Sequence, residues 1–123
     1  LVQALHESGS EGHSRFAKEG KNFFGIKAIH GEDHIVSLAN ASVKVRRFTK
    51  GCDSVIAYTD LLNESYHYED FREERLHQYF VDEINIEKLI ETLSVYAEDK
   101  KYISKLKDMA YTLRKEGIIN ENN

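Results

Sequence analysis

The chain has 123 residues, a mass of 14.2 kDa and a formal net charge of −4, with 17 basic residues against 21 acidic ones. That length, with 41% hydrophobic and 31% charged residues, indicates a single globular domain rather than a disordered chain. The net charge argues against a nucleic-acid binder that relies on bulk positive charge. No apolar run reaches the ~18 residues that cross a bilayer, and the lone Cys52 excludes an internal disulfide and a cysteine-based zinc site.

The first predicted element is a helix over residues 1–7. No capping residue precedes it, and about seven residues are too few for a helix that is stable alone. We therefore expect this helix to be the truncated end of a longer N-terminal region. No signal peptide is recognisable in these residues.

A small β-lobe is predicted next. Six of the seven glycines lie within the first 51 residues, and all seven tyrosines follow them. Residues 22–29 and 41–48 alternate in polarity or are β-branched, and they flank a polar stretch at 30–34. This pattern predicts a hairpin around the polar stretch.

The rest of the chain is predicted to be helical. Apolar residues recur at helical spacing in four segments: 53–62, 68–79, 86–97 and 102–113. Asn85 and Asp99 are predicted helix caps, and Gly117 is a predicted C-terminal stop. The sequence thus predicts one α+β, mostly helical domain over residues 1–119, followed by a frayed tail at 120–123.

Glu7 is the first candidate for chemistry, because it ends the first helix and is followed by Ser8-Gly9-Ser10. A carboxyl at the end of a buried helix, facing a glycine-lined turn, is desolvated on one side and open to a ligand on the other. Such desolvation raises the pKa of a carboxyl and suits it to general acid catalysis. On spacing alone the commoner case is a solvated Glu, or an ion-pair partner of Arg15 or Lys18.

The polar stretch 30–34 holds two histidines and two carboxylates. On a helix the spacing of His30 and His34 could hold a metal, but this segment contains glycine and is predicted to be a loop, so a solvated acidic loop is the preferred interpretation and no metal site is predicted. Glu32 and Asp33 are the closely spaced carboxylates of the predicted lobe. If the lobe borders a cleft, either one is a candidate second carboxylate, which glycosidases hold about 5–9.5 Å from the first.

Three tyrosines could bind the faces of sugars, because an aromatic ring offers an apolar plate with a polar tip. These are Tyr58, Tyr66 and Tyr68. Helical periodicity alone instead makes Tyr58 and Tyr68 core-facing residues.

Short motifs in the first 27 residues carry a family resemblance. Ala4-Leu5-His6-Glu7-Ser8-Gly9 is followed by Ser14-Arg15-Phe16-Ala17 and then by Asn22-Phe23-Phe24-Gly25-Ile26-Lys27. This order resembles that of the bacterial peptidoglycan β-N-acetylglucosaminidases, glycoside hydrolase family 73, which includes Bax-type and FlgJ-type domains. Later segments resemble the same family as far as about Arg114: Val45–Phe48, Asp53–Tyr58, Leu62–Arg72 and Leu89–Tyr102.

The resemblance implies a lysozyme-like fold in which a small β-hairpin lobe faces a glycan cleft. It implies Glu7 as the general acid and Tyr58 as the tyrosine that positions the substrate or steadies the charged transition state. The family does not supply its second carboxylate uniformly, so Glu32 or Asp33 would serve here unless the acetamido group of the substrate assists. The residues implied to bind substrate are Ser14, Asn22, Phe24, Gly25, Lys27, Tyr66 and Tyr68.

Besides its truncated first helix, the chain departs from the family pattern at two places. The Trp-Gly that follows the acid in the family is absent, the chain has no Trp at all, and this turn has one extra residue. Gly12 is then the counterpart of the family glycine, and Glu11 becomes a rival carboxylate. The Asp of the family's Asp-Tyr pair is replaced by Ala57.

The resemblance implies a peptidoglycan hydrolase that cleaves the β-1,4 bond between N-acetylglucosamine and N-acetylmuramic acid by general acid catalysis, with no metal or other cofactor. Two alternatives stay open: a catalytically weak or inactive glycan-binding module with the same fold, and a lytic transglycosylase. The implied partner is the glycan strand of peptidoglycan in the bacterial cell envelope. We expect a monomer that binds no nucleic acid.

Overall fold

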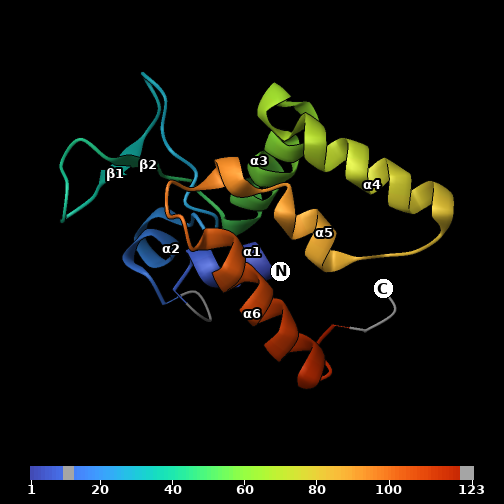
Figure 1. The fold of residues 1–123 in the computed structure, drawn as a ribbon. Helices are drawn as coiled ribbons and strands as arrows, with labels where there is room; N and C mark the ends of the chain where they lie inside the picture. The colour runs from blue at the N-terminus through green and yellow to red at the C-terminus, as the bar shows by residue number, and fades with distance from the viewer. Residues whose placement is uncertain (10–12, 120–123) are drawn as a thin grey trace. The chain divides into compact units, whose positions relative to one another are not determined.

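The computed structural model describes residues 1–9 and 13–119, and it is mostly helical with a small two-stranded antiparallel sheet (Figure 1). This confirms the predicted α+β, mostly helical class. The chain divides into two compact units, Leu1–Thr59 and Asp60–Asn123. The predicted tail at 120–123, and the roles suggested for Glu11 and Gly12, lie outside the described residues.

The first unit contains two short helices, the hairpin and the beginning of a longer helix: α1 (Val2–Glu7), α2 (Arg15–Gly20), β1 (His34–Val36), β2 (Lys44–Arg46) and α3 (Gly51–Glu64). Ile35 of β1 lies opposite Val45 of β2, and both side chains are buried. They share the core of this unit with Ala17 of α2 and with Phe24 and Phe48. The helix predicted over residues 1–7 is confirmed as α1.

The predicted hairpin exists, but its predicted strand boundaries are wrong. Residues 22–29 form no strand beyond an isolated bridge between Lys27 and Val45, and β1 begins at His34, inside the predicted polar stretch. The cause is local. The side chain of Asn22 accepts hydrogen bonds from the backbone N–H groups of Phe24 and Ile26, which curls this segment away from an extended strand.

The second unit is helical and is built from the end of α3, two 3₁₀ turns and three further helices: η1 (Tyr66–Tyr68), α4 (Glu69–Val81), α5 (Ile86–Glu91), η2 (Ser94–Tyr96) and α6 (Tyr102–Lys115). Helical spacing of three or four residues places the side chains of Tyr102, Leu106, Ala110 and Leu113 on the buried face of α6. Within the described residues, no helix has the length and apolar character needed to span a membrane.

Two details of the predicted helices need correction. The helix predicted over residues 86–97 ends at Glu91, where the Thr92 hydroxyl donates a hydrogen bond to the carbonyl of Leu89 at 2.6 Å and the chain passes into η2. Asp99 does not cap α6 at its N-cap, which is Lys101. The Asp99 carboxylate instead accepts a hydrogen bond at 2.9 Å from the N–H of Lys101, in the turn that precedes α6.

Candidate active site

Glu7 is the last residue of α1 and is half buried. The chain turns sharply after it. Ser8 is buried, its N–H donates to the carbonyl of Ala4 at 3.0 Å, and its own carbonyl accepts from the N–H of Ser14 at 2.8 Å. These bonds tie Ser8 to Ala4 and to Ser14, and the Glu7 side chain lies at the edge of a packed region rather than on a solvated helix face.

Gly25 lies directly against the Glu7 carboxylate. A Cβ atom added to Gly25 would lie 3.1 Å from Glu7 Oε2 and 3.9 Å from its Cδ. The φ angle of Gly25 is +65°, a conformation that other residues adopt only with strain. Both the backbone and the available space thus require glycine here, and the two sequence motifs that carry Glu7 and Gly25 meet in space.

Asn22 holds the loop that carries Gly25. It is 1% exposed, and its side chain makes four hydrogen bonds. The amide nitrogen donates to the carbonyls of Ile26 at 2.9 Å and Arg46 at 2.8 Å, and the amide oxygen accepts from the N–H groups of Phe24 and Ile26, each at 3.2 Å. One buried side chain therefore fixes the loop internally and ties it to β2.

Replacing Asn22 with Ala is expected to lower the free energy of unfolding by about 3 kcal/mol, because it leaves several buried backbone groups without partners. Urea unfolding, followed by circular dichroism, measures this loss. Asn63→Ala is the matched control, since Asn63 is exposed and its side chain accepts a hydrogen bond from exposed Arg75, and it should cost well under 1 kcal/mol. Equal losses in the two variants would contradict the role given to Asn22.

Phe24 and Tyr58 form an aromatic stack beside this loop. Their ring centroids are 4.0 Å apart and their planes are inclined by 13°. The Tyr58 hydroxyl donates a hydrogen bond to Oε1 of Gln3, a residue of α1 that is 4% exposed. Gln3 and Glu7 are four residues apart on α1, so Tyr58 of α3 contacts the same helix that carries Glu7.

Phe23 fixes the same loop to the start of α3. A Cβ atom added to Gly51 would lie only 2.6 Å from Cε2 of Phe23, so the Phe23 ring already fills the space beside Gly51. Gly51 is the first residue of α3, and Tyr58 follows two turns later. This close approach, together with the stack on Tyr58, sets the loop against α3 at two points.

Glu32 and Asp33 lie in the hairpin, and both pair with arginines of the second strand region. Glu32 accepts from the N–H of Ile29 at 2.8 Å and forms an ion pair with Arg46 at 3.1 Å. Asp33 lies 3.8 Å from Arg47, and its side chain is 74% exposed. The Glu32 carboxylate therefore supports the turn before β1, whereas the Asp33 carboxylate is largely in solvent.

The remaining candidates occupy different positions. The Ser14 hydroxyl caps α2 by accepting from the N–H of Ala17 at 3.2 Å, and Lys27 is exposed and joins β2 through its backbone. Tyr66 and Tyr68 belong to the second unit. Tyr66 is 77% exposed, whereas Tyr68 is buried, packs against Tyr96, and has its hydroxyl pKa raised by that burial.

Comparison with protein families gives one match. The family model Glucosaminidase, described as mannosyl-glycoprotein endo-beta-N-acetylglucosaminidase, matches residues 1–115. The chain belongs to the glucosaminidase family. Searches among curated proteins and among solved structures found no match. The glucosaminidase match confirms the family resemblance carried by the sequence motifs and spans Glu7, the Asn22 loop and Tyr58.

The candidate site also contains two side chains to which the sequence motifs assigned no role. Gln3 is the clearest, since it is a buried polar side chain placed one helical turn before Glu7. Its spacing from Glu7 was a usable signal. Arg46 is the other, because its carbonyl holds Asn22, its guanidinium pairs with Glu32, and it stacks over the ring of Phe48 at 4.6 Å.

Proposed function

We propose that this glucosaminidase hydrolyses the β-1,4 bond between N-acetylglucosamine and N-acetylmuramic acid in peptidoglycan, and that it acts outside the bacterial cytoplasm. The observation that carries the proposal is the placement of the Glu7 carboxylate against Gly25, within the residues that the glucosaminidase family matches. The enzyme named in the family description acts on glycosides of N-acetylglucosamine. Peptidoglycan is the substrate of the family whose motifs the chain resembles.

In this proposal Glu7 is the general acid. Its proton passes to the glycosidic oxygen as the bond from the anomeric carbon breaks, so the leaving sugar departs as an alcohol and positive charge develops on the remaining ring. Because Glu7 is half buried beside the loop that carries Gly25, its carboxyl has one packed side and one accessible side. Water then adds to the anomeric carbon, and the proton that it loses passes to a carboxylate of the site, which leaves a neutral hemiacetal.

The second group of the reaction is proposed to be Asp33 or Glu32, or the acetamido oxygen of the substrate itself. Asp33 is the more available of the two carboxylates, because its side chain is 74% exposed and its arginine contact is 3.8 Å long. Glu32 is held by a backbone N–H and by Arg46. Loss of activity in Asp33→Asn, with Glu32→Gln active, would assign the role to Asp33.

Tyr58 is proposed to position the substrate through a ring and hydroxyl fixed by Phe24 and Gln3. Tyr58→Phe keeps the stack but removes the hydroxyl that Gln3 accepts from. We expect a fall of about tenfold in kcat/KM and a loss of about 1 kcal/mol in stability, the scale of one hydrogen bond. Steady-state kinetics on soluble glycan fragments measures the first quantity. Full activity in this variant would remove the role assigned to the hydroxyl.

The experiment that tests the proposed function is analysis of the new chain ends in digested peptidoglycan. The digest is reduced with borohydride and examined by mass spectrometry, so that reducing ends of N-acetylglucosamine appear as the alditol. A hydrolase of the proposed specificity produces these ends. Anhydromuramic ends would instead identify a lytic transglycosylase, and the absence of new ends with retained binding would identify a glycan-binding module.

A further inference from the structure

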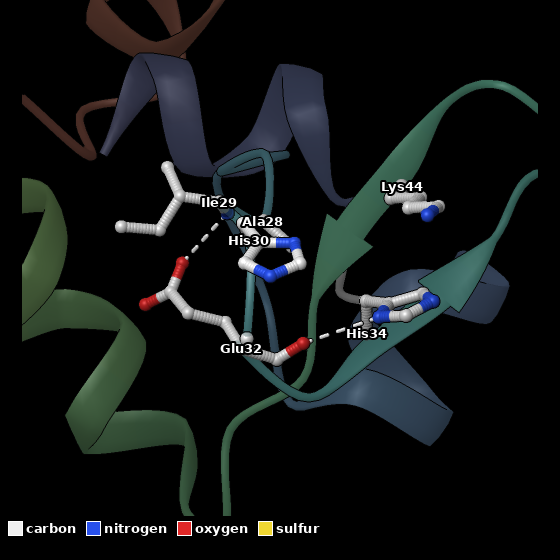
Figure 2. Close-up of a pocket in the computed structure, with 7 residues that line it drawn as sticks. Ala28, Ile29, His30, Glu32, His34 and Lys44 are labelled. Atoms are coloured by element: carbon white, nitrogen blue, oxygen red, sulfur yellow. Dashed lines mark hydrogen bonds between the residues drawn. The ribbon is translucent and has the colours of Figure 1, made fainter.

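A pocket of about 500 Å³ opens in the hairpin, beyond the loop that carries Gly25. We call it the hairpin pocket. Its lining includes His30 and Glu32 from the turn before β1, His34 at the start of β1 and Lys44 at the start of β2 (Figure 2). Glu7 and Tyr58 are not among the residues that line this pocket, whereas Glu32, a candidate for the second group of the reaction, is.

Glu32 supplies the carboxylate of the hairpin pocket, and this carboxylate already has a hydrogen-bond partner and an ion-pair partner. The Glu32 carboxylate points toward Ile29 and accepts a hydrogen bond from its N–H at 2.8 Å (Figure 2). It also forms an ion pair with Arg46. The carbonyl of Glu32 lies 3.1 Å from Nδ1 of His34. Because a carbonyl oxygen can only accept, Nδ1 carries the hydrogen, and the other ring nitrogen of His34 is directed away from Glu32 (Figure 2).

The groups that remain for a ligand are therefore nitrogen groups. His30 is exposed, His34 is half buried, and Lys44 is exposed. Among residues 1–9 and 13–119, no carboxylate forms an ion pair with Lys44. In the same part of the chain, no group of three or more His, Cys, Asp and Glu side chains is arranged to hold a metal ion. An anionic group is the ligand that these side chains fit best.

The charge of the surrounding segment favours the same ligand. Residues 26–50 contain five Lys and Arg against two acidic residues, in a chain whose net charge is −4. Both of these acidic residues face arginines, Glu32 facing Arg46 and Asp33 facing Arg47. The hairpin is thus a cationic region of an acidic protein, which attracts anions toward this pocket.

The position and size of the hairpin pocket connect it with the proposed substrate. Ala28, which lines the pocket, follows Gly25 by three residues, so their Cα atoms are at most about 11 Å apart. Gly25 in turn lies against Glu7. A volume of about 500 Å³ is far larger than the space of one small ion, and it suits an organic substituent that bears a charge.

We propose that the hairpin pocket binds a carboxylate of the peptide substituent on the muramic acid sugar beside the cleaved bond. The Lys44 ammonium and the imidazoles of His30 and His34 donate the hydrogen bonds. This inference rests on the proposed function, because it assumes that peptidoglycan occupies the Glu7 site. It adds a preference for glycan strands that carry charged peptides over bare or neutralised strands.

The test measures binding by calorimetry with the Glu7→Gln protein, so that the glycan stays intact. The probes are a soluble peptidoglycan oligosaccharide with its peptides and the same oligosaccharide after amidation of its carboxylates. We expect the charged probe to bind about tenfold more tightly, a difference typical of one charge-assisted hydrogen bond. Adding Lys44→Glu should abolish the difference, adding Lys44→Arg should keep most of it, and adding Lys50→Glu, the same charge change outside the pocket, should leave it unchanged.

Equal affinities for the two probes would overturn the proposal, as would an equal loss of affinity for both probes in the Lys44→Glu protein. A glycerol phosphate oligomer is tested in parallel. Binding of this oligomer through Lys44, without preference between the two glycans, would assign the pocket to a phosphate polymer and would also overturn the proposal. Cleavage by the unmodified protein without a carboxylate preference would reject the pocket alone. A carboxylate preference without cleavage would reject the proposed function alone.

Discussion

The Glu7→Gln variant is expected to cleave peptidoglycan about 10²–10⁴-fold more slowly than the unmodified protein, because an amide cannot donate the proton that the leaving sugar needs. The substitution preserves the size and shape of the side chain beside Gly25. The fold should therefore be kept, and the loss should lie in kcat rather than in binding. Initial rates on purified peptidoglycan measure the effect.

Two measurements separate this result from an indirect one. The unfolding temperature of Glu7→Gln should match that of the unmodified protein. Glu11→Gln is the matched control, because Glu11 is the rival carboxylate of the same turn in the sequence, and this variant should retain its rate. Full activity in Glu7→Gln, or a comparable loss in Glu11→Gln alone, would contradict the assignment of Glu7 as the acid.

The Gly25→Ala variant is expected to lose about 10–10² in kcat/KM, since a new methyl group 3.1 Å from Glu7 Oε2 must displace the carboxylate. It should also lose about 1–2 kcal/mol of stability, because φ is +65° at this position. Kinetics and urea unfolding measure the two effects separately. Only a small fraction of the Gly25→Ala protein should be unfolded at 25 °C. The loss of rate should therefore be larger than unfolding of that fraction explains.

Gly117→Ala provides the control for backbone strain. Gly117 has a φ of +75°, and a Cβ at this position would meet nothing within 4 Å. This variant should lose a similar amount of stability and keep full activity. If both variants lost activity alike, strain in the backbone would explain the result, and the contact between Gly25 and Glu7 would have no particular part in it.

Much of the fold could be predicted because apolar residues that recur at helical spacing indicate a helix. The segment 102–113 became α6, with Leu106 and Ala110 fully buried, and Gly117 follows its end with positive φ. The hairpin was harder to predict. Its strands are only three residues long, and the bonds of the Asn22 side chain, rather than alternation of polarity, decide the path of residues 22–28.

The site was predictable where short motifs carry it and unpredictable where single partners matter. The motifs of Glu7 and Gly25 were visible in the sequence, and their contact follows from the fold. The hydrogen bond from Tyr58 to Gln3 joins residues 55 positions apart, and no local sequence pattern predicts such a pair. Likewise, the arginine partner of Glu32 could be identified only once the strands were paired.

The most direct test of the central claim compares the unmodified protein and Glu7→Gln on one preparation of purified peptidoglycan. Sedimentation gives the fraction of protein bound, and mass spectrometry of the reduced supernatant gives the new ends. We predict equal binding by both proteins, with N-acetylglucosamine ends released only by the unmodified one. Release of the same ends by Glu7→Gln at an unchanged rate, or no release by either protein despite binding, would contradict the claim that Glu7 is the acid of a working glucosaminidase.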